Sequence, residues 1–133
     1  MIGDWVKVEG NFTTKITAIF GEMVQTQAEY QSEIDGEWYG EAEIKDLHPI
    51  PLTAEILEKN GFRKDLMYFY LNIDDEKLLE FYIHEKRLRL WFDGVDEWVK
   101  ATIKDLLFQC QCKYVHQLQH ALRLCNIDKE IEL

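Results

Sequence analysis

Hydrophobic and polar positions alternate loosely through the first part of the chain. The apolar positions fall in four short runs, which are "DWVKV", "TTKITAIF", "EMVQTQAEY" and "EWYGEAEI". Glycines and a predicted turn at Asp35-Gly36 separate these runs, and alternation with a period of two is typical of strands with one buried face. Four or five strands in so short a segment can cover their edges only by curling. Residues 1–48 are therefore predicted to form a small SH3-like β-barrel.

Two prolines mark the end of this first region. Pro49 and Pro51 cannot donate to a strand ladder, so we place the boundary between residues 1–48 and 49–133 here. Thr53 is a good N-cap for a short helix over residues 54–59, and Asn60-Gly61 is a good stop. We expect residues 49–133 to pack together as one compact unit.

A different pattern follows, in which aromatic and aliphatic residues alternate along four runs. These runs are "LMYFYLNI", "KLLEFYIH", "RLRLWF" and "EWVKATI", and they predict an antiparallel meander. A turn over Glu85-Lys86 would pair His84 with Arg87. One side of the sheet would then carry three apolar pairs, namely Ile83 with Leu88, Phe81 with Leu90 and Leu79 with Phe92.

A last helix, over residues 113–125, is predicted to cover that apolar side. At 100° per residue, its apolar positions fall within about 240° to 360° of Val115. They are Tyr114, Val115, Leu118, Ala121, Leu122 and Cys125. The "EIEL" segment after the helix is expected to add a short strand. The predicted fold class is α+β, with an N-terminal SH3-like β-barrel followed by an antiparallel sheet that a C-terminal helix covers.

The other side of the predicted meander carries the candidate binding residues Tyr82, Arg89, Trp91 and Trp98. A two-residue turn at Asp93-Gly94 would place Arg89 between Tyr82 and Trp98. Such a row could hold a guanidinium group by cation–π contact or present stacking surfaces to a base or peptide. Three interpretations stay open: ordinary packing against the N-terminal barrel, a protein partner or self-association, and stacking of nucleic-acid bases.

His116 and His120 are weak candidates for metal ligands, because an i, i+4 pair projects from one side of a helix. They fall at about 100° and 140° from Val115, whereas Cys125 falls at about 280°, so the three cannot share one ion. Gln117 stands where an H-E-x-x-H protease has its catalytic Glu. The alternative is a pair of histidines at the solvent edge of the helix. We predict no dedicated metal site and no cofactor.

The three cysteines, Cys110, Cys112 and Cys125, predict neither a disulfide framework nor a zinc ribbon. Their number is odd, and the first two form C-x-C rather than C-x-x-C. In an extended segment Cys110 and Cys112 would point the same way. We expect reduced thiols that are buried or half-buried.

Composition and charge narrow the possible functions. The 25 acidic and 15 basic residues give a formal net charge of -10, which repels phosphate backbones and anionic lipids. Nucleic acid and membrane are therefore not expected as partners. No apolar run has the length of a membrane span and no secretory signal pattern is present, so a cytoplasmic protein is expected. No catalytic motif is found and no small-molecule substrate is indicated.

Two segments carry a resemblance to other proteins: "PIPLTAEILEKNGF" (residues 49–62) and "YVHQLQHALRLC" (residues 114–125). The chain resembles a family of short uncharacterised proteins of gut anaerobic bacteria and their phages or mobile elements. The resemblance implies a bacterial, phage or mobile-element setting and no catalytic residue.

Our main hypothesis is a noncatalytic interaction or accessory protein. The alternatives are a nucleic-acid-associated accessory protein that uses the aromatic and arginine face, and a metal-dependent enzyme centred on His116 and His120.

Overall fold

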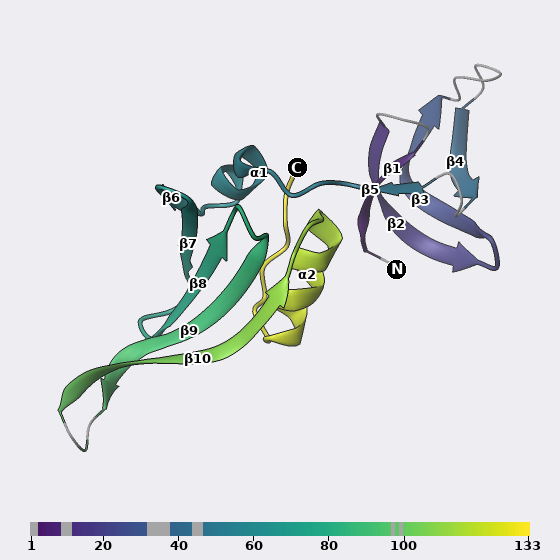
Figure 1. Ribbon diagram of the computed structural model, residues 1–133. Coiled ribbons are helices and arrows are strands. Elements are labelled where there is room, and N and C mark those ends of the chain that lie inside the picture. The colour runs from purple at the N-terminus through teal and green to yellow at the C-terminus, as the bar shows by residue number, and fades with distance from the viewer. Residues whose placement is uncertain (1–2, 9–11, 32–37, 44–46, 97, 99) are drawn as a thin grey trace. The chain divides into compact units, whose positions relative to one another are not determined.

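The computed structural model describes residues 3–8, 12–31, 38–43, 47–96, 98 and 100–133 (Figure 1). The chain divides into two compact units, Met1–Pro51 with Tyr114–His116 and Leu52–Lys113 with Gln117–Leu133. Each unit contains one five-stranded antiparallel sheet, and the described residues also form two helices. The α+β class predicted from the sequence is confirmed. The turn predicted at Asp35-Gly36 lies outside the described residues.

The first sheet has the strand order β4-β3-β2-β1-β5. Its strands are β1 (Trp5–Val8), β2 (Phe12–Phe20), β3 (Met23–Gln31), β4 (Trp38–Glu43) and β5 (Leu47–Pro49). One side is apolar, because buried and half-exposed side chains alternate along β1, and its core consists of Val6, Val8, Ile16, Val24 and Ala42. Over the described residues β4 and β5 end the sheet without pairing with each other, so the sheet is not a closed barrel.

The second unit begins with helix α1 (Ala54–Lys59), which has the predicted bounds and caps. The Thr53 side chain accepts a hydrogen bond from the backbone N–H of Ile56 at 3.4 Å. At the other end Asn60 is the C-cap, and Gly61 takes the left-handed conformation at φ 91° that glycine adopts without strain. Local sequence chemistry is enough to specify this helix.

The second sheet has the strand order β10-β9-β8-β7-β6. Its strands are β6 (Arg63–Asp65), β7 (Tyr68–Asn72), β8 (Lys77–Tyr82), β9 (Arg87–Asp96) and β10 (Ala101–Gln111). An antiparallel meander is therefore present, with β6 as a further edge strand. Its first three predicted strands are confirmed, but the fourth was predicted too early in the chain, because β9 runs on to Asp96 and β10 starts only at Ala101.

The register of β8 with β9 differs from the prediction by two residues. Tyr82 pairs with Arg87 and Phe81 with Leu88, so the predicted pairing of His84 with Arg87 is wrong. The turn occupies residues 83–86, because the Ile83 N–H donates to the Met67 carbonyl at 3.1 Å and Lys86 adopts φ 53°. A shift of two residues keeps every side chain on its predicted side of the sheet.

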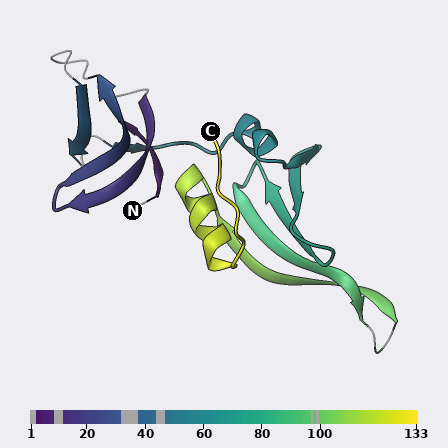
Figure 2. The ribbon, with the colours of Figure 1, turned by 180° about the vertical axis from the view of Figure 1, so that it is seen from behind.

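One side of this sheet is closely packed. Its fully buried side chains include Phe69, Leu79, Phe81 and Leu88. Helix α2 (Val115–Leu124) and the segment that follows it lie along the sheet in Figure 2. The helix contributes the buried residues Leu118, Ala121 and Leu122, which belong to the predicted apolar arc. We call this side of the sheet the inner face and the opposite side the outer face.

Residues 126–133, which we call the tail, form no strand, so the strand predicted at "EIEL" is absent. Ile127 and Ile131 of the tail are nevertheless buried. The main chain of the tail bonds to the side chains of Asn60 and Gln119 instead of to a strand. Side-chain amides thus replace the expected strand ladder.

Candidate functional site

The candidate row Tyr82–Arg89–Trp98 is not formed. Strand β9 continues through the predicted turn at Asp93-Gly94, and Arg89 pairs with Gln109 of β10 rather than with Trp98. Gly94 is needed inside the strand for a different reason: a Cβ atom there would lie 2.9 Å from the Phe92 ring. Trp98 lies instead in the turn that connects β9 with β10.

The other three candidates, Tyr82, Arg89 and Trp91, do lie on the outer face. Each is half-buried, and Tyr82 lies opposite Tyr68 of β7. The rings of Tyr68 and Tyr82 stack at a centroid distance of 4.8 Å, and the rings of Tyr68 and Tyr70 stack at 6.1 Å. A ladder of tyrosine rings therefore crosses β7 and β8. Stacking within the ladder uses ring faces that a ligand would otherwise contact.

Tyr70 ends this ladder beside acidic groups. Burial raises the pKa of the Tyr70 phenol, and the negative charges of Glu80 and Asp65, together with Tyr68, raise the pKa further. A neutral phenol keeps its proton and can donate a hydrogen bond. The Tyr70 phenol therefore stays protonated at neutral pH.

Arg89 pairs with an acidic residue of the neighbouring strand. Its Nη1 atom lies 3.7 Å from Oε1 of Glu80, a carboxylate that is buried on the outer face. The charge of Arg89 is therefore compensated within the sheet. Its Nε atom and the indole Nε1 of Trp91 are both covered, and neither has a hydrogen-bond acceptor in the described part of the chain. Lys104 Nζ lies 4.7 Å from the Trp91 ring centroid.

These two N–H groups are covered hydrogen-bond donors of the outer face that lack an acceptor among the described residues. A covered donor without an acceptor costs about 1–3 kcal/mol, so natural proteins rarely retain one without a reason. A carbonyl or carboxylate of a partner could accept from Arg89 Nε or Trp91 Nε1 once the groups that cover these atoms shift.

Beyond the last pair of β8 with β9, strands β9 and β10 continue as a two-stranded extension, which we call the arm (residues 93–96, 98 and 100–104; Figure 1). Trp98 at its turn is 96% exposed, and Val95 is 56% exposed. Leu106 and Leu107, next to the arm and at the β-bulge of β10, are also exposed. The arm therefore presents large apolar side chains on a narrow ribbon.

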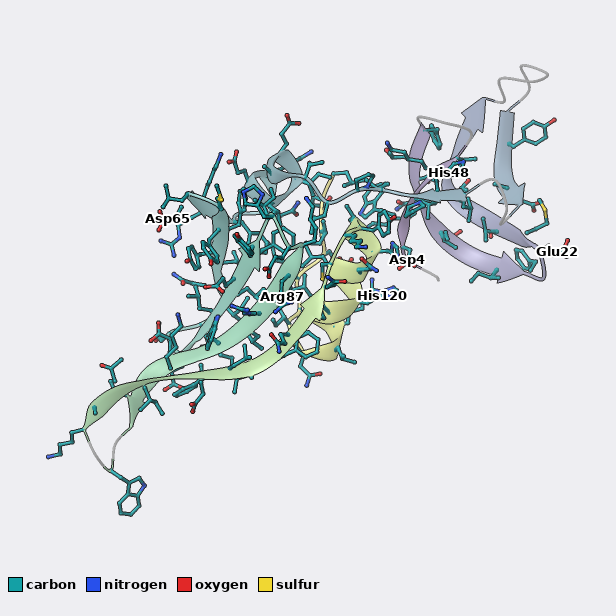
Figure 3. All side chains as sticks on the ribbon, in the orientation of Figure 1. Asp4, Glu22, His48, Asp65, Arg87 and His120 are labelled. Carbon is teal, nitrogen blue, oxygen red and sulfur yellow. The ribbon has the colours of Figure 1, made fainter. Side chains whose placement is uncertain are left out.

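The two weak metal candidates lie on α2, and Figure 3 shows His120 projecting from this helix. Both imidazoles are half-buried, and the ring of His116 stacks on that of Tyr114 at a centroid distance of 5.8 Å. No group of three or more His, Cys, Asp or Glu side chains suited to a metal ion occurs within the described residues. The structure therefore offers no ligand set to which this histidine pair belongs.

The cysteines are thiols in protected surroundings. Cys112 is buried while Cys110 and Cys125 are half-buried, as predicted. The Sγ atoms of Cys110 and Cys112 lie 3.5 Å apart, which confirms that both point to one side. Burial raises the pKa of the Cys112 thiol, and the neighbouring Cys110 raises it further; burial and then Cys110 do the same for Cys125. Because the thiolate is the reactive form, these groups are poor nucleophiles.

Two polar residues with an important role were not recognised from the sequence. Asn60 was read only as a helix stop, and Gln119 was not singled out, yet both are buried and bind the tail. A signal was present for Gln119, which falls about 40° from Val115, at the edge of the apolar arc. Only contacts distant in sequence identify its partners.

No protein-family model, curated protein or solved structure matches this chain. Among the described residues, neither helix has the length and apolar character needed to cross a membrane.

Proposed function

We propose that this protein is a noncatalytic interaction protein that contacts a protein partner through the arm and the neighbouring outer face. The observation that carries the proposal is the exposure of Trp98, 96% of which is accessible at the turn of the arm. Tryptophan is enriched among residues that dominate binding energy at interfaces. Burying so large a side chain against a partner would yield more than burying any other exposed residue of the arm.

The arm supports this proposal because its apolar side chains are accessible to a partner. Val95 and Trp98 are exposed there, while the core of this unit lies under α2. An isolated two-stranded hairpin is only marginally stable in water. A partner that covers Trp98 and Val95 would stabilise the arm as it binds.

The outer face adds polar specificity at the base of the arm. The Arg89 Nε and Trp91 Nε1 donors favour a partner segment with main-chain carbonyls or carboxylates. Nucleic acid is a weaker candidate for the same surface, because Glu80 already compensates the charge of Arg89 and the chain carries a net charge of -10.

Two finer parts of the proposal concern the first sheet and the biological setting. The return of β5 to pair with β1, and the bulge between Ile16 and Ala18 that bends β2, support an SH3-like barrel as the class of the first sheet. The resemblance of residues 49–62 and 114–125 to short phage and mobile-element proteins supports an accessory role in such a setting.

The test compares Trp98→Ala with the matched control Phe20→Ala, which removes an exposed ring from the other sheet. Self-association is measured by light scattering over a range of concentrations. Partners in a bacterial extract are captured in parallel on all three immobilised proteins. We expect a species that the wild type and Phe20→Ala retain and Trp98→Ala loses. Equal retention by all three proteins, with no self-association, would refute the role of the arm.

A further inference from the structure

The buried side-chain carboxamides of Asn60 and Gln119 form hydrogen bonds with the main chain of the tail. The Gln119 Nε2 group donates to the Lys129 carbonyl at 2.9 Å, and its Oε1 atom accepts from the Ile131 N–H at 2.8 Å. Asn60 makes the same kind of pair with Glu132: Nδ2 donates to the carbonyl and Oδ1 accepts from the N–H, both at 2.7 Å. Gln119 is 3% exposed and Asn60 5%.

Both carboxamides belong to helix ends or helices, and the one of Asn60 is held by its own helix. Asn60 Nδ2 also donates to the Ile56 carbonyl of α1 at 2.7 Å, which fixes the orientation of the amide at the end of that helix. Gln119 lies in the middle of α2, between the buried residues Leu118 and Ala121. The donor–acceptor pair of Asn60 is therefore positioned in advance for an extended segment.

The site makes few demands on side chains. Ile131 is fully buried, whereas Asp128, Glu130 and Glu132 are exposed. Lys59 Nζ donates to the main-chain oxygen of Leu133. Recognition therefore rests on main-chain groups and on two buried aliphatic side chains, Ile127 and Ile131. Proteins bind extended peptides in this way: main-chain hydrogen bonds provide affinity and a pocket provides specificity.

The site also has room beside the segment that occupies it. A cavity of about 360 Å³ lies next to the start of the tail, between Leu71–Ile73 at the end of β7 and residues 126–129. The tail leaves α2 at Asn126, where φ is 58°. A single residue in this conformation ends the helix and starts the tail.

We propose that the groove formed by Asn60, Gln119 and the Ile131 pocket is a recognition site for an extended peptide segment of a partner protein, and that the tail occupies it as a competing ligand. The segment needs an aliphatic residue at the Ile131 position and main-chain N–H and carbonyl groups beside it. The site is separate from the arm, so each can fail without the other.

The first test measures hydrogen exchange in the full chain. If the tail leaves the groove on its own, the amides of Ile131 and Glu132 exchange at least a hundredfold faster than those of Leu79 and Phe81 in β8, and their rates do not depend on denaturant. Equal rates at all four amides would mean that the tail leaves only on global unfolding. That outcome overturns the proposal.

The second test uses the full-length variant Ile131→Asp, whose tail cannot fill the apolar pocket, and a fluorescent peptide with the sequence of residues 128–133. We expect this variant to bind the peptide at least tenfold more tightly than the wild type does. The control Glu132→Gln changes an exposed side chain of the same segment and should match the wild type. Adding Gln119→Leu to Ile131→Asp should abolish peptide binding.

Three outcomes of the second test would overturn the proposal. One is equal peptide binding by Ile131→Asp and the wild type. Another is equal binding by Ile131→Asp with and without Gln119→Leu. The last is a wild-type dimer in light scattering that Ile131→Asp abolishes, because the occupant would then be the tail of a second copy. If Ile131→Asp does not fold, the exchange rates in the wild type decide.

Discussion

The tail and the arm of the second unit show opposite combinations of order and burial. The tail has no regular secondary structure, yet Ile131 is fully buried and two amide side chains bind its main chain. The arm is a regular antiparallel ribbon, yet Trp98 and Val95 are exposed. Regular backbone hydrogen bonding is therefore a poor guide to which segment is firmly held.

The physical reason lies in how little a hydrogen bond contributes on balance. A main-chain pair in the ribbon exchanges bonds with water for bonds within the protein and contributes only about 0.5–1.5 kcal/mol. Burying an aliphatic side chain contributes about 1.5–3 kcal/mol, without losing an alternative partner in water. The tail is stabilised both by main-chain hydrogen bonds and by apolar burial, whereas the part of the arm around Val95 and Trp98 is stabilised mainly by main-chain hydrogen bonds.

The largest expected effect is that of Ile131→Ala. Removing a fully buried aliphatic side chain should lower the free energy of unfolding by about 2–5 kcal/mol. The matched change in the arm, Val95→Ala, should alter it by less than about 0.5 kcal/mol. Urea denaturation followed by circular dichroism measures both. Similar values for the two variants would end the contrast between the tail and the arm.

The next effect separates amide recognition from apolar burial. Gln119→Ala leaves the Ile131 N–H and the Lys129 carbonyl without their partner, and should cost about 1–3 kcal/mol. The control is Gln109→Ala on strand β10, where the side chain is exposed, and it should have almost no effect. A cost for Gln109→Ala as large as that for Gln119→Ala would show that the amide pair is unimportant.

Substitutions in the outer face at the base of the arm should have an intermediate effect on the free energy of unfolding. Arg89→Met leaves the buried Glu80 carboxylate without its ion pair, and we expect a loss of about 1–2 kcal/mol because Arg89 is partly exposed to solvent. Arg87→Met, which removes a more exposed pair with Glu85, should cost less than about 1 kcal/mol. Urea unfolding of the two variants and the wild type tests this order.

The smallest effect should appear only at high pH. Because the folded protein raises the pKa of Tyr70, mainly by burial, the unfolded chain loses this proton first as the pH passes about 10. The stabilisation is complete below that pH and falls as the pH rises toward the pKa of the folded state. The wild type should therefore lose more stability between pH 9 and 11 than Tyr70→Phe does, as measured by urea midpoints. Parallel losses would contradict the shift.

Local chemistry explains the predictions that were confirmed. Helix α1 has its predicted bounds because Thr53, Asn60 and Gly61 specify both ends within a few residues. The inner and outer faces of the second sheet were assigned correctly even though the register was wrong, because a shift of two residues preserves the alternation of sides. The candidates Tyr82, Arg89 and Trp91 therefore share a face as predicted.

Long-range contacts explain the predictions that failed. Trp98 left the proposed row because Asp93 and Gly94 pair with Lys104 and Ile103 of β10 instead of forming a turn. The hairpin after β8 begins its turn early because Ile83 donates to Met67, a residue of the preceding connection. The tail forms no strand because Asn60 and Gln119 take up its main-chain groups.

The sequence by itself determined the class of the fold, the ends of α1, the apolar arc of α2 and the two-sided character of the sheet. These features depend on periodicity and on residues that are close neighbours in the chain. The tertiary structure decided which strand residues face each other, where Trp98 lies and which amides hold the tail. Each of these choices depends on the difference in free energy between alternative partners that are far apart in sequence. That difference amounts to only a few hydrogen bonds and one packed ring.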